Sequence, residues 1–190
     1  MRLLALDTSE LIAQAASWLA CKQNYQWLDF GSGRQVVTPA VLKIMLHKDS
    51  NFMRVYTSDD DGTPIGLVGL NNVDRVYGTA TFWGLSGDKS FGSRGYSTLA
   101  SSKLMTLAFG SLGLASVNTW AVEGNPSIRT IERLGFRFIG RLRRCHYIDD
   151  RPCDRLLFDL LAEEHTEIAE VRRDRTEKTN RESTREALRV

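Results

Sequence analysis

The segment FGSRGYST, from Phe91 to Thr98, is the most informative part of the sequence about the fold. A strand-like segment (78–85) precedes it and an apolar stripe of helical spacing follows it, so we expect a strand, a loop over 87–95 and a helix to about residue 110. Small residues leave backbone N–H groups accessible, and a helix N-terminus adds unpaired donors. The pattern predicts a phosphate-binding loop, with a plain connection as the alternative. The predicted binding residues are Ser93, Arg94, Gly95, Tyr96, Ser97 and Thr98.

A second informative stretch runs from Glu123 to Phe136 and reads EGNPSIRTIERLGF. It follows an apolar strand (116–122), and Asn125 or Ser127 can cap the helix that it predicts. Two long strands (136–147 and 155–161) follow around a turn, which predicts a hairpin. On its residues alone, this stretch is a capped surface helix.

The N-terminal half alternates helices and strands. We expect a strand over 2–6, a helix that begins at Asp7–Ser9, and a second helix that begins at Thr38 with proline in its first turn. Strands over 52–58 and 64–70 should pair around a glycine turn. The last residues (166–190) are rich in charges of both signs and poor in apolar ones, so we divide the chain into a domain (1–165) and a tail that is helical or disordered.

Composition excludes several classes of protein. With 190 residues, 42% of them hydrophobic, the chain fits one domain and can bury a core. A net charge of +2 is too small for a general nucleic-acid binder, and no apolar stretch reaches the ~20 residues of a membrane span. Three cysteines, an odd number, argue against a secreted disulfide framework. We therefore expect a soluble cytoplasmic protein, either a monomer or a homodimer, with no nucleic-acid or membrane partner.

Taken together, the two stretches resemble the GNAT superfamily of acetyl-CoA-dependent N-acetyltransferases. In that family an R/Q-x-x-G-x-G/A loop binds the pyrophosphate, and a motif like N-x-x-S-x-R-x-x-E-K-x-G-F follows. Gly95 occupies the first glycine position of the loop, whereas Ser97 replaces the second and Gly92 replaces the Arg or Gln. The second motif is matched by Ser127, Arg129, Glu132, Arg133, Gly135 and Phe136. The resemblance covers about residues 1–164 and is greatest to the branch with ribosomal-protein N-terminal, spermidine and amino-sugar acetyltransferases.

The resemblance implies an α/β (α+β) fold. It has a mixed, mostly antiparallel sheet flanked by helices, splayed central strands and a C-terminal hairpin. The strands over 78–86 and 116–122 would form the gap for the pantetheine arm of acetyl-CoA, with backbone contacts that include Leu85. A bulge there needs permissive residues, which Gly84 and Gly87 could supply. Trp83 and Trp120 fall on these strands and are the candidate residues for binding the acceptor.

Acetyl transfer needs a deprotonated amine and a partner for the leaving thiolate. The tyrosine acid of many family members is replaced by Ile131. In the favoured branch a serine of the second motif is the proposed thiolate partner, and Ser127 occupies that place, although it can equally be a helix cap. Glu123 at the end of a gap strand is a candidate base, against a plain surface carboxylate. Asn125 could bind the pantetheine arm or cap the helix.

The sequence thus predicts an N-acetyltransferase that uses direct attack in a ternary complex. A small-molecule primary amine is preferred as acceptor because Trp27, Phe30 and Trp83 could wall a compact pocket. A protein N-terminus or lysine is the alternative, and a non-catalytic acyl-CoA-binding module is the alternative of another class. The residues that flank the hairpin turn, Cys145, His146, Cys153 and Asp154, lack the spacing of a zinc site, so no metal is predicted.

Overall fold

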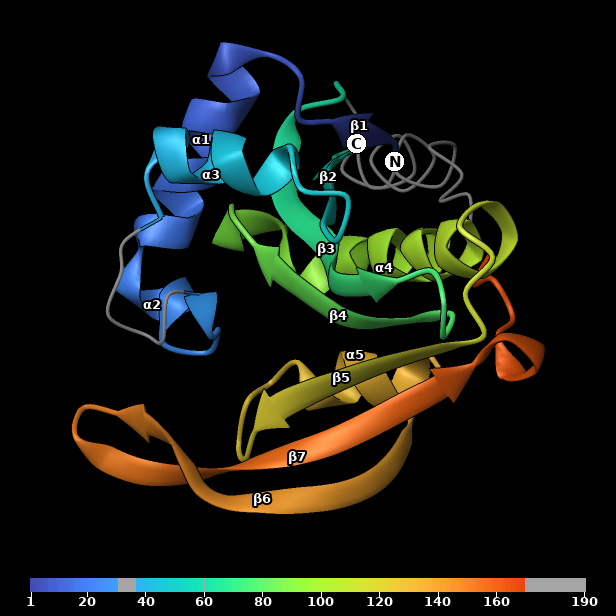
Figure 1. Cartoon of the computed structure of the whole chain (residues 1–190). Coiled ribbons are helices and arrows are strands. Elements are labelled where there is room, and N and C mark those ends of the chain that lie inside the picture. The colour runs from blue at the N-terminus through green and yellow to red at the C-terminus, as the bar shows by residue number, and fades with distance from the viewer. Residues whose placement is uncertain (31–36, 60, 170–190) are drawn as a thin grey trace, which may run out of the picture.

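The computed structural model describes residues 1–30, 37–59 and 61–169. Its centre is a seven-stranded sheet in the order β1-β2-β3-β4-β5-β7-β6, in which only β4 and β5 are parallel neighbours (Figure 1). The strands are β1 (Leu3–Ala5), β2 (Phe52–Thr57), β3 (Pro64–Asp74), β4 (Thr79–Ser86), β5 (Ser116–Val122), β6 (Arg137–Ile148) and β7 (Arg151–Leu161). The α-helices are α1 (Ser9–Ala20), α2 (Lys22–Tyr25), α3 (Pro39–Leu46), α4 (Tyr96–Thr106) and α5 (Ile128–Arg133). This arrangement confirms the predicted mixed, mostly antiparallel sheet.

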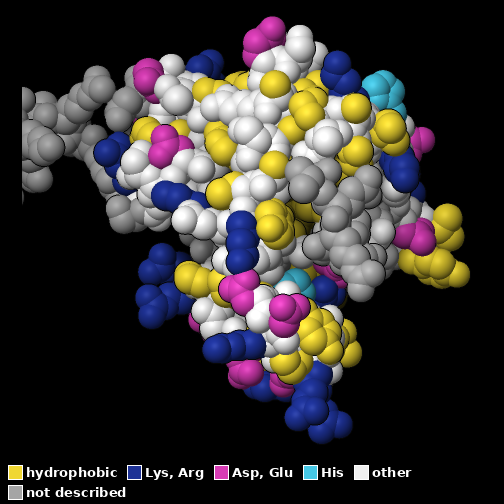
Figure 2. Space-filling model, turned by 90° about the vertical axis from the view of Figure 1, so that its left-hand side faces the viewer, with side chains coloured by type: hydrophobic (Ala, Val, Ile, Leu, Met, Phe, Trp, Pro, Cys, Tyr) yellow, Lys and Arg dark blue, Asp and Glu magenta, His cyan; other side chains and the backbone are white. Residues whose placement is uncertain are grey.

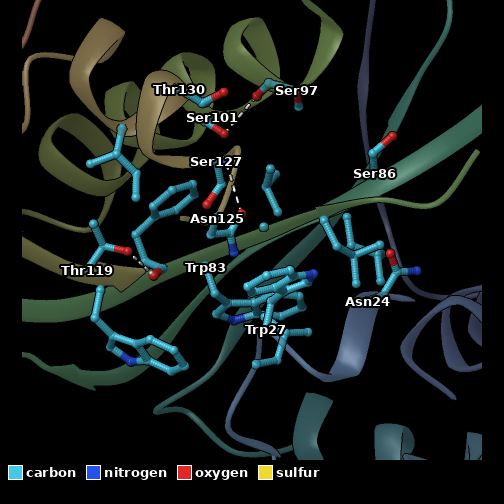
Figure 3. Close-up of a pocket in the computed structure, with 18 of the residues that line it drawn as sticks. Asn24, Trp27, Trp83, Ser86, Ser97, Ser101, Thr119, Asn125, Ser127 and Thr130 are labelled. Atoms are coloured by element: carbon cyan, nitrogen blue, oxygen red, sulfur yellow. Dashed lines mark hydrogen bonds between the residues drawn. The ribbon is translucent and has the colours of Figure 1, made fainter. Parts of the chain in front are cut away.

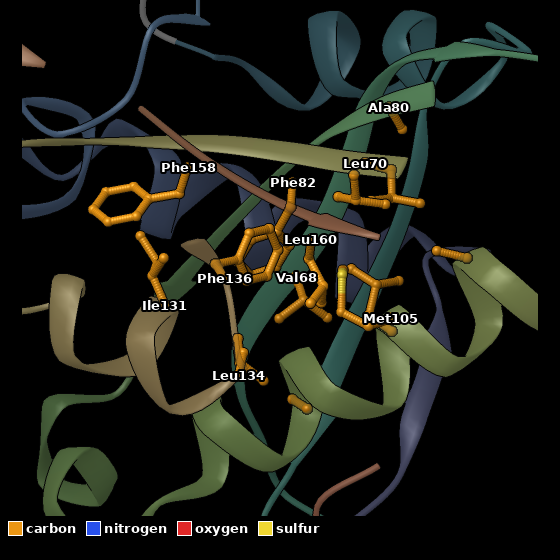
Figure 4. Packing of buried hydrophobic residues seen from close by; sticks show 14 of the residues in the cluster. Val68, Leu70, Ala80, Phe82, Met105, Ile131, Leu134, Phe136, Phe158 and Leu160 are labelled. Atoms are coloured by element: carbon orange, nitrogen blue, oxygen red, sulfur yellow. The ribbon is translucent and has the colours of Figure 1, made fainter. Parts of the chain in front are cut away.

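Helices cover both faces of the sheet, so the core has two parts. On one face α4 and α5 pack on β3, β4, β5 and β7, and Figure 4 shows Val68, Phe82, Met105 and Leu134 meeting there. On the other face α1 and α3 pack on β2, β3 and β4. Adjacent residues of β3 therefore serve different cores, because strand side chains alternate between faces: Leu67 lies in the second cluster and Val68 in the first. Burial on both faces explains why this strand reads as a continuous apolar run.

The predicted starts of α1 and α3 are confirmed. The Thr8 side chain accepts a hydrogen bond from Leu11 N at 3.3 Å, and the Thr38 side chain accepts one from Val41 N at 3.3 Å. Both are N-caps, and Pro39 fills the first turn of α3, where its missing N–H costs nothing.

Three segments differ from the sequence prediction. Lys22–Tyr25 forms the short helix α2 in a region that showed no regular pattern. Lys89–Arg94 forms a 3-10 helix, η2, where a loop was expected, because the Asp88 carboxylate accepts a hydrogen bond from Ser90 N and caps it. α4 ends at Thr106, and a π-helical turn (Leu107–Ser111) completes the segment that had been expected to continue as α-helix.

The start of the predicted tail contacts the domain. Ile168 N donates to Ser102 Oγ at 2.8 Å, and the Ile168 side chain packs against the cluster under α4. Residues 170–190 lie outside the described part of the chain.

The β6–β7 hairpin is the lower lobe of the molecule, and Figure 2 shows hydrophobic and basic side chains close together on it. β6 is an edge strand, and Phe138, Ile139, Leu142 and Tyr147 are exposed along it. The choice between monomer and homodimer stays a prediction. Within the described ranges, none of the helices combines the length and apolar character that crossing a bilayer requires.

Candidate active site

The parallel strands β4 and β5 separate after three residue pairs. β4 and β5 pair with each other at three positions: Thr79 with Ser116, Ala80 with Val117 and Thr81 with Asn118. Both strands continue beyond these positions but no longer pair with each other. At the point of separation, Thr119 Oγ1 donates to the Phe82 carbonyl at 2.9 Å. The gap expected between these strands is therefore present.

A cavity of about 490 Å³ occupies this gap. Its walls come from the diverging ends of β4 and β5, from the start of α4, from the β5–α5 connection and from the segment around α2 (Figure 3). Thr119, Asn125, Ser127 and Thr130 lie on one side of Trp83, and Asn24 and Ser86 lie on the other. The cavity thus joins elements that are up to about a hundred residues apart in the sequence.

Ser127 presents its hydroxyl to this cavity. It stands at the N-cap position of α5, but its side chain makes no capping hydrogen bond. Asn125 takes that role instead, since its Oδ1 accepts from Ser127 N at 2.9 Å. Of the two roles open to Ser127, the geometry disfavours the cap and leaves the hydroxyl available to a ligand. Asn125 lines the cavity as well, so both of its predicted roles stay open.

The predicted phosphate loop lies at the N-terminus of α4. Gly95 has φ +76°, a left-handed conformation that glycine adopts without strain, and no side chain caps this helix. The first-turn amides of Tyr96, Ser97 and Thr98 are therefore positioned as anion donors, and Gly92 and Ser97 line the cavity. The Tyr96 side chain is buried, and its hydroxyl accepts a hydrogen bond from Asp59 N at 3.4 Å, so only its backbone can serve a ligand.

Two more residues of the predicted loop belong to η2. Arg94 is exposed, and its guanidinium lies 5.0 Å from the centre of the Phe91 ring. Ser93 lies beside it in the same 3-10 turn. Their contacts with a cofactor stay predictions.

Strand alternation decides which amides of β4 face the gap. Because the Phe82 carbonyl points to β5, the N–H groups of Gly84 and Ser86 point the same way, whereas that of Leu85 points to β3. Leu85 lines the cavity, but the backbone amides that point into the gap are those of its neighbours Gly84 and Ser86. β4 keeps a regular register with β3 from Thr81 to Ser86, so the expected bulge at Gly84 is absent there.

An irregular pairing does occur one residue beyond β4. The amides of Gly87 and Asp88 both donate to the Ile65 carbonyl at 2.9 Å, a two-to-one pairing typical of a bulge. A side chain at position 87 would meet the ring of Trp18 at 2.3 Å, so glycine is required there by space.

Glu123 is not among the described residues that line the cavity. Its carboxylate is half exposed and accepts two hydrogen bonds from Arg141, at 2.7 and 3.1 Å. Arg141 also binds Asp154 at 3.0 Å, and the pKa of the Asp154 carboxyl is lowered by the hydrogen bond from the Arg144 amide and by this arginine. Because Arg141 engages both of its carboxylate oxygens and Glu123 is absent from the described lining, the geometry favours a structural link for Glu123 over the predicted role as a base.

The aromatic residues predicted for the acceptor site come together. Trp27, Phe30, Trp83 and Trp120 all line the cavity. The Phe30 and Trp83 rings meet edge to face at 4.9 Å, and Trp83 Nε1 donates to Asn71 Oδ1 at 3.0 Å. Sequence reasoning missed Asn24, Asn71 and Thr119, of which only Thr119 carried a signal, as a polar residue in an apolar strand.

Metal-ligating side chains do not gather within the described ranges, where no group of three or more His, Cys, Asp or Glu residues could hold an ion. At the hairpin, His146 is engaged at both ring nitrogens, by Gln26 O and by Arg155.

Comparisons with known proteins point to one family. The model of the acetyltransferase (GNAT) domain family matches residues 7–137. The protein of Bacillus subtilis (strain 168) named "Putative ribosomal N-acetyltransferase YdaF" is 35% identical over 105 residues, 55% of this chain and 57% of its own length. The chain thus matches little more than half of that curated relative.

Solved structures show the same fold. A variant of spermidine N-acetyltransferase SpeG from Vibrio cholerae has a TM-score of 0.73 at 17% identity, covering 86% of this chain and 96% of its own. The same Vibrio enzyme in complex with CoA and spermine has a TM-score of 0.70, again at 17% identity, covering 86% and 95%. The matched domain is an acyltransferase domain whose donor is acetyl-CoA, as the sequence predicted. The predicted resemblance to this family is confirmed, and the chain belongs to the GNAT acetyltransferase family.

Proposed function

We propose that this chain transfers an acetyl group from acetyl-CoA to the primary amine of a small molecule, by direct attack in a ternary complex. The observation that carries the proposal is the cavity between the splayed ends of β4 and β5, with the Ser127 hydroxyl on one wall and aromatic rings on another. A donor thioester and an acceptor amine need such a shared, largely apolar space.

The donor would bind along the gap. We assign the pyrophosphate to the first-turn amides of α4 (residues 96–98) because a helix N-terminus supplies unpaired N–H groups and a positive field. We assign the pantetheine arm and the thioester oxygen to the amides of Gly84 and Ser86, which lack a strand partner on that side. Donors aimed at the oxygen where charge develops are the largest common contribution to acyl transfer.

In the chemical step, the amine nitrogen bonds to the thioester carbon and the carbon–sulfur bond breaks. The amine gives up its proton, and the departing thiolate takes one. We assign the hydrogen bond to the thiolate to Ser127. The amine would lose its proton through desolvation in the aromatic part of the cavity, because burial disfavours the charged form of an amine. No dedicated base is then needed.

The name of the Bacillus relative favours one alternative, transfer to a protein N-terminus. A protein acceptor could place only its terminal residues in the cavity, whereas a small amine can enter a cavity of about 490 Å³ whole. The smaller acceptor is therefore the better match.

The experiment is free-thiol release from acetyl-CoA with a panel of small primary amines, short peptides with free N-termini and the same peptides already N-acetylated. Faster release with small amines than with free peptides supports the proposal. Preference for free peptides over small amines supports the protein alternative. CoA binding without amine-dependent release would overturn acetyl transfer altogether.

A further inference from the structure

The acceptor end of the cavity is unusually poor in charge. Among the described lining residues, only Asp29 and Lys89 are charged, and the other polar groups there are amides and hydroxyls. The rings of Trp27, Phe30, Trp83 and Trp120 are also part of the lining and are suited to contact with an aromatic or apolar body.

The one carboxylate in this set is already neutralised. Arg155 Nη2 binds Asp29 Oδ2 at 2.9 Å, and the Arg155 side chain is only 15% exposed. The same guanidinium lies 3.8 Å from the centre of the Trp120 ring and donates to His146 Nδ1 at 3.0 and 3.3 Å. The cation site over this face of Trp120 is therefore occupied by the protein's own arginine.

These contacts hold the arginine firmly in place. Arginine can only donate, so His146 Nδ1 must accept, and the proton of the neutral ring lies on Nε2. His146 Nε2 then donates to the Gln26 carbonyl at 2.7 Å. Lys22 pairs with Asp149 at the hairpin turn, which adds another link between the α2 segment and the hairpin. The ion pair of Asp29 with Arg155 is thus built into the junction between these two elements.

The second charged side chain of the lining is that of a lysine. Lys89 Nζ donates to Asn24 Oδ1 at 2.6 Å and to the Ser86 carbonyl at 2.7 Å, and burial lowers the pKa of its ammonium group. Among the described lining residues, the only carboxylate is therefore one that Arg155 already pairs, and no other negative charge faces an amine. A second or third ammonium on the acceptor would be desolvated without a partner and repelled by Arg155.

We propose, resting on the acetyl transfer proposed above, that the acceptor is a monoamine with an aromatic or apolar body, and that the Asp29–Arg155 pair excludes polyamines. The fold resembles that of polyamine-acetylating enzymes, but the charges at this end of the cavity do not suit a polycation.

The wild-type protein tests this directly. Phenethylamine and tryptamine should show kcat/KM at least about tenfold above spermidine and spermine, since a buried ring contributes more than this factor. Quenching of tryptophan fluorescence by phenethylamine, spermidine and spermine should give the same order of affinities without turnover, so the inference is tested even if transfer fails. A preference for spermidine in either measurement overturns it and leaves acetyl transfer itself standing.

Variants of the ion pair test its role. Arg155→Gln uncovers Asp29 and should raise the ratio of spermidine to phenethylamine kcat/KM by about tenfold, whereas Arg155→Lys keeps a cation and should leave the ratio near wild type. The double variant Arg155→Gln with Asp29→Asn removes the uncovered charge and should restore the wild-type ratio. An unchanged ratio in a folded Arg155→Gln variant, with an unaltered melting temperature, refutes the assigned role of the pair.

Discussion

Replacing Ser127 with alanine separates chemistry from helix capping. The hydroxyl lines the cavity and makes no capping bond, so its removal should leave the free energy of unfolding within about 0.5 kcal/mol of wild type. If the hydroxyl assists the thiolate, kcat should fall by about 100-fold, the lower end for a single acid–base group and equivalent to about 2.7 kcal/mol. Steady-state kinetics with free-thiol detection, calorimetry with CoA and urea unfolding measure the three quantities on one preparation. The affinity for CoA should not change.

Two control variants calibrate this result. Thr38→Ala removes a true N-cap outside the cavity lining and should cost about 1 kcal/mol of stability with kcat unchanged. Asn125→Ala removes the group that caps α5 and should cost a similar amount. If Ser127→Ala behaved like Thr38→Ala, losing stability and keeping kcat, Ser127 would be a cap and the assignment of the thiolate partner would be refuted.

Four further predictions concern the rest of the site and the fold. Because Glu123 is paired with Arg141, Glu123→Gln should lower kcat/KM by less than about fivefold and equally at all pH values, and a loss that deepens at low pH would instead identify a base. Ser97→Pro removes one first-turn amide and should weaken CoA binding at least about tenfold by calorimetry, while Ser97→Ala keeps the amide and should not. A chain ending after Ala169 should keep the wild-type melting temperature, whereas one ending after His165 loses the Ile168 contact and should melt at a lower temperature. Burial lowers the pKa of His165 from 6.5, so its contribution to folding stability should be fully present above pH 6.5 and should decrease as the pH falls below it. Urea unfolding at pH 7 and pH 5 measures this decrease, which should be smaller in the variant His165→Gln.

Some backbone features of the proposed donor half could be predicted from sequence because their determinants are local. The left-handed Gly95, the uncapped start of α4 and the Asn125–Ser127 turn each lie within a few residues, and their residue types restrict backbone geometry directly. The apolar stripes of α1 and α4 were likewise sufficient to place both helices. The end of α4 at Thr106 could not be predicted, since a π-helical turn has no pattern distinct from that of an α-helix.

The aromatic residues of the acceptor half were named from the sequence, but its charged contacts could not be predicted because they join distant segments. Asp29 and Arg155 are 126 residues apart, and nothing near either one indicates the other. Arg141 and Glu123 are 18 residues apart, and only the folded hairpin brings the guanidinium to that carboxylate. Trp27 and Phe30 were expected in the pocket wall because they are aromatic. Asn24, which lines the same cavity, lies in α2, a helix that the sequence did not indicate.

The gap between β4 and β5 has a local cause at Thr119, where the two strands separate. Past Thr81 and Asn118 the two backbones no longer pair, and the Phe82 carbonyl would be buried without a donor. The Thr119 hydroxyl supplies one at 2.9 Å, so the strands can separate without the cost of an unsatisfied polar group. β7 pairs with β5 from Ser116 to Val122, which keeps β5 straight while it diverges. In the same way β4 pairs with β3 along its other edge. Each of the two strands beside the gap is therefore hydrogen-bonded on its outer edge, and the β4 amides that point into the gap are available to a ligand.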